Sequence, residues 1–295
     1  MRDDVRDSRG ISTVAEVLEL NLRRMGKPIV PKEHGAWAVL FGAFLVGLGV
    51  AGRMNLPVLL LLVGVTAAAF ANGAFTILLR SATGPAHAIR RRRALAWSLV
   101  YASLAVAALV PLLMVFRMTF LIPFGMGAGL FLVLRGLMVR GRGDRSLVGE
   151  LTGTAGLTMV GPIAHAVAAG EVRLVGAVLW LLLFLFFSSG VFHVRARLQA
   201  WLARRKGGAS ASAAFARCLV YHVLLILVIP LLAILHILPW PALLAFAPAV
   251  WRAAVGLRQD GVDLDLVRLG WSEVALSTAF VLLLVGAFHL TSLAG

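Results

Sequence analysis

The sequence predicts an all-α membrane protein: a polytopic bundle of about nine transmembrane helices with its N-terminus in the cytoplasm. Three observations lead to this prediction. Of 295 residues, 60% are hydrophobic and only 14% are charged, a composition outside the usual range of soluble globular domains. The hydrophobic residues gather in runs close to the roughly 20 residues that a bilayer-spanning helix needs. The basic residues gather on one side of those runs.

Residues 1–30 are predicted as a cytoplasmic N-terminal tail, and residues 31–295 as a single transmembrane helical domain. The tail mixes acidic and basic residues and has no apolar segment of the kind found in a cleavable signal peptide. Thr13 and Glu16 have the spacing of a capping box, and apolar residues follow them. This pattern predicts a short helix lying on the membrane interface.

The apolar runs follow the tail in order. We place them at residues 36–52, 56–79, 95–115, 118–138, 149–169, 173–194, 215–237, 239–256 and 271–292. The seventh and eighth meet at Leu238-Pro239-Trp240-Pro241, which predicts a tight turn because proline does not suit a helix interior. Residues 206–212 are a Gly/Ser/Ala-rich stretch and are predicted as a linker within the one domain.

The basic residues set the orientation and limit the partners. The net charge is +15, and nearly all Lys and Arg residues lie in the tail and in alternate loops, with only Arg53, Arg117 and Arg173 opposite them. The positive-inside rule then places the N-terminus in the cytoplasm. Because these charges occupy short loops and no soluble basic domain, no nucleic-acid partner is predicted. Membrane lipids are the expected partners, above all for the run Arg90 to Arg93.

Cysteine and histidine usage gives little support for a metal centre. Cys218 is the only cysteine, so no intrachain disulfide or thiolate metal site can form, and a small buried residue is the simpler interpretation. A paired-histidine site needs two rings at matched depth on facing helices. Only His193 with His222 or His34 meets that condition, and no metal is predicted.

Three glutamates lie at the cytoplasmic ends of apolar runs. Glu33, Glu150 and Glu273 stand at the first, fifth and ninth runs, where the helix dipole favours a carboxylate and a plain capping role would explain them. The alternative is that they orient basic partners around a shared cavity that opens to the cytoplasm. In that case Glu33 or Glu150 is also a candidate proton acceptor.

The sixth run ends in a polar stretch, Phe187-Ser-Ser-Gly-Val-Phe-His-Val-Arg-Ala-Arg197. His193 and Arg197 share one helical face because they are four residues apart. Arg195 and Arg197 are explained by the positive-inside rule alone, but His193 and the two serines favour a site that faces an anion. The arginine fork suits phosphate or carboxylate.

Asn72 is the only amide in the second run and precedes Arg80 by about two turns. A hydrogen bond between helices is the commoner purpose of such an asparagine. The cavity hypothesis adds both residues to the site. The candidate catalytic residues are Glu33, His34, Glu150 and His193, and the candidate substrate-binding residues are Lys32, Trp37, Asn72, Arg80, Arg195, Arg197 and Glu273.

Two stretches carry a resemblance to a known family. Pro31-Lys-Glu-His-Gly-Ala-Trp37, together with Phe187 to Arg197, resembles the YwiC-like family of bacterial integral membrane proteins, over most of the chain from Pro31 onward. The resemblance implies a multi-pass protein of the bacterial cytoplasmic (inner) membrane. It supplies no established reaction.

A more distant resemblance concerns the fold. Nine helices, a cytoplasmic N-terminus and Gly149-Glu150-Leu151 opening the fifth run are similar to the UbiA superfamily of membrane prenyltransferases. That superfamily holds an isoprenoid diphosphate through Mg²⁺ on two aspartate-rich segments. The corresponding stretches here, Phe70 to Arg80 and Phe187 to Arg197, contain no Asp or Glu. Without those carboxylates no Mg²⁺ or other cofactor is expected, and Arg and His would neutralise the anion directly.

The sequence therefore supports three classes of function. The first is a UbiA-like transferase acting on a lipid or isoprenoid diphosphate. The second is a transporter or lipid-binding protein, which would need discontinuous helices or polar residues through the midplane. Gly153, Gly156 and Pro162 in the fifth run are the main features of that kind. The third is an accessory membrane protein with no catalysis.

Overall fold

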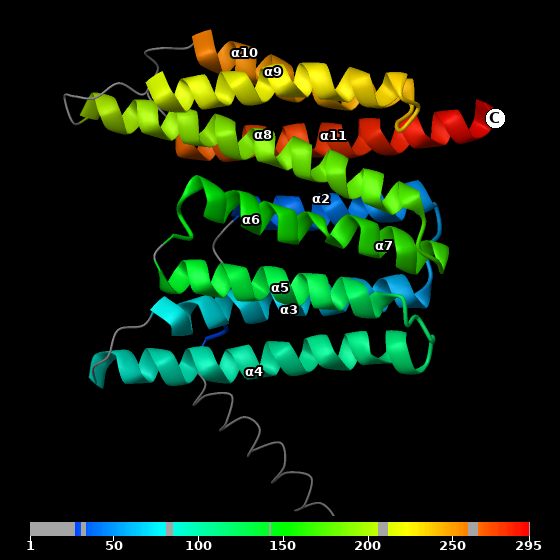
Figure 1. The fold of residues 1–295 in the computed structure, drawn as a ribbon. Helices are drawn as coiled ribbons and strands as arrows, with labels where there is room; N and C mark the ends of the chain where they lie inside the picture. Colours follow the sequence, from blue (N-terminus) through cyan, green and yellow to red (C-terminus); the bar gives the residue numbers. More distant parts are fainter. Residues whose placement is uncertain are drawn as a thin grey trace, which may run out of the picture. The chain divides into compact units, whose positions relative to one another are not determined.

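The computed structural model describes residues 27–30, 34–80, 85–141, 143–205, 212–258 and 265–294. Figure 1 shows its helices in chain order. The described residues divide into two compact units, one of 27–30, 63–80 and 85–108, and one of 34–62, 109–141, 143–205, 212–258 and 265–294. The interfacial helix predicted in the tail, and all of the predicted linker except Ser212, lie outside the described residues. The single transmembrane domain over residues 31–295 stays a prediction.

The described residues are helical apart from turns, and every predicted apolar run is helical. The helices are α2 His34–Ala51, α3 Leu56–Arg80, α4 Pro85–Met114, α5 Leu121–Arg140, α6 Leu147–Thr158, α7 Val160–Ala169, α8 Leu174–Arg205, α9 Ser212–Ile234, α10 Leu243–Arg258 and α11 Leu266–Ala294, with a 3-10 turn η1 Trp240–Ala242. Among these, six are long and apolar enough to cross a membrane: α3, α4, α5, α8, α9 and α11. The chain is therefore a multi-pass membrane protein.

Several helices extend beyond the predicted apolar runs. α4 begins at Pro85, α8 continues to Arg205, and α11 begins at Leu266. An apolar run marks only the part of a helix that hydrocarbon would cover, whereas Arg, Leu and Ala are good helix formers that continue the helix beyond it. The early start of α11 places Glu273 well inside the helix and not in its first turn.

The fifth run is interrupted at Met159, between α6 and α7. Met159 keeps helical dihedral angles, φ −59° and ψ −20°, so the interruption is a kink and not an unwound segment. Pro162 lacks the N–H that would bond the carbonyl of Thr158. Near the kink the carbonyl of Ala155 accepts hydrogen bonds from the indole Nε1 of Trp180 and from the Thr158 hydroxyl, both at 3.1 Å. Side chains thus satisfy backbone groups at the kink.

Helix α2 packs against α7 and α11 through small residues. A Cβ added to Gly47 would lie 2.0 Å from the carbonyl oxygen of Gly161, and one added to Gly49 would lie 2.7 Å from Cγ2 of Val285. Membrane helices gain much of their packing from such close approach of backbones. We call the contact formed by Gly47, Gly49 and Gly161 the glycine seam.

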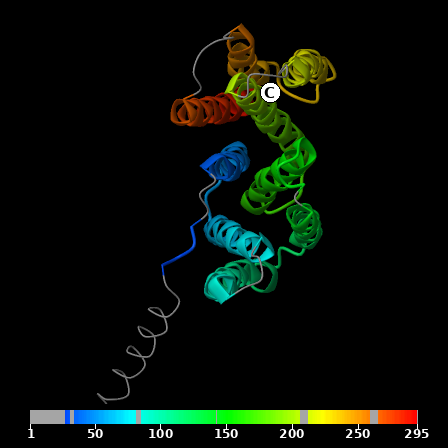
Figure 2. The same ribbon diagram turned by 90° about the vertical axis from the view of Figure 1, so that its left-hand side faces the viewer.

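Aromatic rings join α8, α10 and α11 in the second unit. The rings of Phe186 and Phe280 are stacked with centroids 3.8 Å apart, and Phe246 meets the edge of Phe280 at 5.4 Å. Buried aliphatic residues surround them, including Leu182, Leu225 and Leu284. Figure 2 shows this unit from one side, with α8 to α11 grouped together. The arginine-rich ends of α8 and α10 lie at one end of this group, which we call the basic end.

In the first unit, α4 holds the segment of residues 27–30. The ring of Tyr101 packs between Phe70 and Trp97, with centroids 5.1 and 5.3 Å away. Its hydroxyl donates to the carbonyl of Ile29 at 3.4 Å, and Arg93 donates to the carbonyl of Lys27. The chain that leads toward α2 is therefore held against α4 by side-chain contacts with its backbone.

Candidate functional site

Polar side chains from four helices meet inside the second unit near the basic end. We call this group the Arg252 cluster. Its members are Ser189 and His193 on α8, Cys218 and His222 on α9, Arg252 on α10, and Glu273 on α11. Ser189, His193, Cys218 and His222 are buried, at no more than 5% exposure. Such a group is costly in a membrane protein unless its members pair with one another or bind a ligand.

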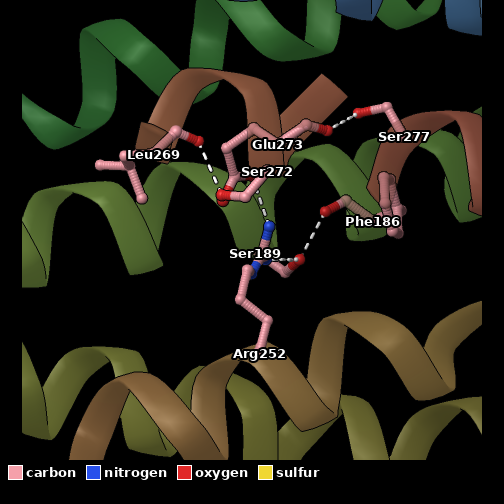
Figure 3. Close-up of polar contacts among 7 residues, drawn as sticks. All are labelled: Phe186, Ser189, Arg252, Leu269, Ser272, Glu273 and Ser277. Atoms are coloured by element: carbon pink, nitrogen blue, oxygen red, sulfur yellow. Dashed lines mark hydrogen bonds and ion pairs between the residues drawn. The ribbon is translucent and has the colours of Figure 1, made fainter. Parts of the chain in front are cut away.

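Arg252 is the centre of the cluster (Figure 3). Its guanidinium donates from Nη1 to Glu273 Oε2 and from Nη2 to Ser189 Oγ at 2.9 Å. The Ser189 hydroxyl in turn donates to the carbonyl of Phe186 at 2.6 Å. The Arg252 side chain is 9% exposed and that of Glu273 is 23% exposed. A guanidinium this deeply buried needs a partner, because its desolvation is otherwise uncompensated.

Glycine at position 190 gives the ion pair its space. A Cβ at Gly190 would lie 3.1 Å from Glu273 Oε2 and 3.8 Å from Arg252 Nη1. The carboxylate and guanidinium therefore rest against the bare backbone of α8. Any larger residue would crowd the carboxylate more than the guanidinium.

The two histidines lie within electrostatic range of Arg252. The His222 Nδ1 atom is 2.8 Å from the carbonyl oxygen of Cys218, so Nδ1 carries the hydrogen and Nε2 is left as an acceptor. The His193 ring packs on α10, where a Cβ at Gly256 would lie 2.3 Å from its Cε1 atom. Arg197 also acts on His193 electrostatically.

Three buried atoms of the cluster lack a hydrogen-bond partner within the part of the chain that the structure describes. They are Arg252 Nε, Glu273 Oε1 and His222 Nε2. Buried polar groups are normally paired, so the lack of a hydrogen-bond partner at each of these atoms has to be explained. Together they provide one donor and two acceptors at a place where basic side chains outnumber the single carboxylate.

A second ion pair joins α6 and α8. Arg195 Nη1 lies 2.9 Å from Glu150 Oε1 and donates to the carbonyl of Arg145 at 3.0 Å. The side chains of Arg195 and Glu150 are 23% and 37% exposed. This pair is more open than the Arg252–Glu273 pair, and partly exposed pairs contribute little free energy.

Neither of these glutamates supplies the side-chain cap of its helix. Ser146 Oγ accepts from Gly149 N at 3.0 Å at the start of α6. At the start of α11, Asp265 Oδ1 accepts from Val267 N at 2.9 Å and from Arg268 N at 3.1 Å. Glu150 lies in the first turn of α6, where the helix dipole favours its carboxylate as predicted, and it also pairs with Arg195. Glu273 lies deeper in α11 and pairs with Arg252. The roles of both glutamates in catalysis or binding stay predictions.

The other predicted site residues fall outside this arrangement. Lys32 and Glu33 lie outside the described residues, as does the side chain of His34, whose backbone begins α2. Trp37 stacks on Phe41 at 5.6 Å on α2. Asn72 and Arg80 belong to α3 within the first unit, where the Asn72 carbonyl accepts from Thr76 at 2.8 Å. Of the predicted set, the structure brings Glu273 into contact with Arg252 and places His193 in the same cluster, while Arg197 acts on His193 electrostatically.

Arg252 itself was missed, because it was counted with the loop charges that set the orientation. The signal was present: Arg252 lies inside the predicted apolar run 239–256, and an ionisable residue within a membrane span marks a functional site by default. Cys218 is 1% exposed, which agrees with the simpler interpretation of this residue as a small buried side chain.

The guanidinium of Arg252 is the part of the cluster best able to hold a ligand. No group of three or more His, Cys, Asp or Glu side chains able to hold a metal occurs among the described residues. Arg252 offers a planar fork of donors, and such a fork matches the oxygens of phosphate or carboxylate. Two histidines and Arg197 would add positive charge as the anion enters.

Comparison with known proteins gives one match. A family model described as YwiC-like protein matches residues 30–165. The match includes the Pro31 to Trp37 motif and ends before Phe187, so the resemblance is narrower than the sequence suggested. No curated protein and no solved structure matches, and similarity to the UbiA superfamily is not shown.

Proposed function

This chain is, over residues 30–165, a member of the YwiC-like family, and from that premise and the Arg252 cluster we propose that it binds an anionic lipid-like molecule. The ligand class is a phosphate-bearing headgroup, such as that of an isoprenoid diphosphate or an anionic lipid. The basic end faces the cytoplasm of a bacterial inner membrane in this proposal. The observation that carries it is the buried guanidinium of Arg252, with His193, His222 and Arg197 near it and one carboxylate against them.

The charge of the cluster supports an anion as ligand. Coulomb energies rise steeply where water is excluded, so the same guanidinium attracts a phosphate far more strongly here than on a wet surface. Glu273 neutralises the Arg252 guanidinium in the empty site, so an anion would bind by taking the place of this carboxylate or together with a proton on a histidine. The histidines are neutral or positive according to their surroundings, and an entering anion favours the positive form.

The membrane supplies a place for the apolar part of such a ligand. α9, which carries His222, exposes large apolar side chains along its length, including Leu219, Val223 and Leu227. A headgroup held by Arg252 would let its hydrocarbon chain lie along apolar helix surfaces. The site would then select amphipathic anions over small ions by the added burial of apolar surface.

The catalytic form of the proposal is transfer of the isoprenoid group, as in UbiA-like enzymes. The carbon–oxygen bond to the diphosphate would break, the diphosphate would leave with the electron pair, and an acceptor atom would bond to the carbon. Arg252 and His193 would stabilise the departing diphosphate by charge and hydrogen bonds. Glu33 or Glu150 would take the proton that the acceptor loses.

A transporter is the second candidate, and the kinked α6–α7 helix favours it. His165 on α7 is 4% exposed, and its Nδ1 has no hydrogen-bond partner among the described residues. A buried polar residue beside a helix kink is typical of substrate or proton paths through membrane proteins. Vectorial uptake of the ligand into vesicles would favour this candidate over transfer.

A binding assay on purified protein in lipid nanodiscs tests the proposal. Labelled farnesyl diphosphate is titrated into the wild type, the double variant Arg252→Met/Glu273→Leu, and the control Arg268→Ala. Arg268 is exposed at the start of α11, outside the cluster. We expect the wild type and control to bind alike and the double variant to bind at least about tenfold more weakly, since charged hydrogen bonds are lost.

Equal binding by all three proteins would remove the Arg252 cluster as the site. Addition of candidate acceptors, with and without Mg²⁺, then separates binding from transfer. Formation of a prenylated product by the wild type and not by the double variant would support catalysis, whereas binding without product would favour a lipid-binding or transport role.

A further inference from the structure

We propose that Glu273 is an internal competitor for the ligand: its carboxylate holds the Arg252 guanidinium in the empty site, and the phosphoryl group of the ligand displaces it. The inference rests on the proposed anion binding and adds a regulatory step to it. In this account the ion pair seen in the structure is the closed form of the site. Ligand binding exchanges one anionic partner of Arg252 for another.

The first observation is that the carboxylate is held incompletely. Arginine and carboxylate groups often pair through two parallel hydrogen bonds, but here only Oε2 of Glu273 is bonded to Arg252. Its Oε1 is buried and has no hydrogen-bond partner in the described part of the chain. A carboxylate bound through one oxygen is a weaker competitor than one bound through two.

The second observation is that the Arg252 guanidinium has a hydrogen-bond donor that is not used. Arg252 uses Nη1 for Glu273 and Nη2 for Ser189, while its buried Nε finds no partner among the described residues. A phosphoryl group presents three oxygens, and one of them can take the Nη1 position that Glu273 holds. The unpaired Nε–H lies on the other edge of the guanidinium, beside Nη2, and can donate to a further oxygen of the ligand. The Ser189 contact would stay in place and keep the guanidinium oriented.

The third observation concerns which group can move. The Arg252 side chain is 9% exposed, and its Nη2 is bound to Ser189, whereas the Glu273 side chain is 23% exposed. On the α8 side the carboxylate lies beside Gly190, which has no side chain to hold it in place. The carboxylate can therefore swing away by side-chain rotation, while the arginine stays at the centre of the cluster.

The buried His222 points independently to a ligand in the same place. This residue is 3% exposed, and its Nε2 acceptor has no partner in the described residues. The His222 ring lies within electrostatic range of Arg252. A phosphate oxygen that carries a proton, or a proton taken up with the anion, would satisfy this nitrogen.

The experiment measures affinity by calorimetric titration with two probes, inorganic pyrophosphate and farnesyl diphosphate. The proteins are the wild type, Glu273→Gln and the matched control Glu171→Gln, which removes the charge from an exposed glutamate–arginine pair outside the cluster. Glu273→Leu is measured as well, so that the role of Glu273 can still be tested if Glu273→Gln is unstable. We expect Glu273→Gln to bind at least about tenfold more tightly than the wild type, because a competing charge in contact with Arg252 is lost. The control Glu171→Gln should bind as the wild type does.

The outcomes separate the two proposals. If the wild type binds and both Glu273 variants bind no more tightly, the competitor role is wrong while anion binding stands. If neither the wild type nor the variants bind either probe, the proposed function fails and this inference fails with it. If the Glu273 variants bind both probes more tightly, the phosphoryl group is what displaces Glu273. If they bind only farnesyl diphosphate more tightly, the displacing phosphoryl group must belong to a lipid headgroup.

Discussion

The glycine seam and the Arg252 cluster lie in the same unit and are built in opposite ways. At the seam, α2 meets α7 and α11 mainly through small residues, and the backbones approach so closely that no Cβ fits at Gly47. One polar side chain lies there, that of His289 on α11, whose Nε2 is 2.8 Å from the carbonyl oxygen of Gly49. In the cluster, charged and polar side chains fill the space between four helices, and several of their atoms have no partner among the described residues.

This difference separates a structural contact from a functional one. Close packing of small residues stabilises a membrane bundle directly. A buried ion pair is weak evidence for stability, since well-packed apolar residues of similar volume are often as good or better. The proposal of anion binding gives the Arg252–Glu273 pair a role other than stability, and substitutions in the two regions should then behave differently.

The largest effect is expected at the seam. Gly47→Ala would place a methyl group 2.0 Å from the backbone oxygen of Gly161, and backbone cannot give way unless α2 separates from α7. We expect a loss of more than about 3 kcal/mol of stability, the upper end of overpacking. Thermal melting in detergent, followed by size-exclusion chromatography, measures it.

The matched control is Gly286→Ala on α11, where no atom lies within 4 Å of the added Cβ. That variant should melt at or slightly above the wild-type temperature, because alanine favours the helix by about 1 kcal/mol. Equal melting temperatures for the Gly47 and Gly286 variants would contradict the claim that close backbone packing at the glycine seam stabilises the protein.

The next largest effect is expected in the cluster. Arg252→Ala leaves the Glu273 carboxylate largely buried without its counterion, and we expect a loss of about 3 kcal/mol. The double variant Arg252→Met/Glu273→Leu should recover most of that loss, since no charge remains to be desolvated. If the double variant melts as low as the single one, the pair is a structural requirement and the contrast with the seam disappears.

A smaller effect is expected at the kink of α6 and α7. Trp180→Phe removes the indole N–H that bonds the carbonyl of Ala155, which should lower stability by about 1 kcal/mol. Faster amide hydrogen exchange around Met159 would report the local loosening. Trp251→Phe, at a residue that is 73% exposed, is the control and should change neither quantity.

The smallest effect is expected at the open pair of α6 and α8. Glu150→Gln should cost about 0.5 kcal/mol or less, because both side chains are partly exposed. The difference from the wild type should shrink further in high salt, as screening weakens exposed pairs. A loss as large as that of Arg252→Ala would show that exposure does not separate the two pairs.

Much of the fold could be predicted from hydrophobicity alone. The nine apolar runs are all helical, and the turn at Pro239 and Trp240 is formed by η1 where the prolines predicted it. The charged ends of the helices were not predicted, because a search for apolar runs finds only the part of a helix that the hydrocarbon of the membrane would cover. The kink at Met159 was indicated by Pro162, but the role of Trp180 in satisfying Ala155 depends on a tertiary contact that spacing does not reveal.

The candidate site was predicted less well, for a physical reason. His193 and Glu273 were identified because polar residues beside apolar runs are conspicuous. Their shared partner Arg252 was missed because a basic residue near a helix end also satisfies the positive-inside rule. Only the packing of α10 against α8, at Gly256 and Ser189, shows that this arginine points inward.

Native mass spectrometry of the protein released from its own membrane tests the central claim most directly. We expect the wild type to retain a phosphate-bearing lipid or isoprenoid, and the Arg252→Met/Glu273→Leu variant to lose that species while staying folded. Identical bound phospholipid and isoprenoid populations in the two proteins, or no phosphate-bearing ligand on the wild type, would contradict the claim that the Arg252 cluster is an anion site.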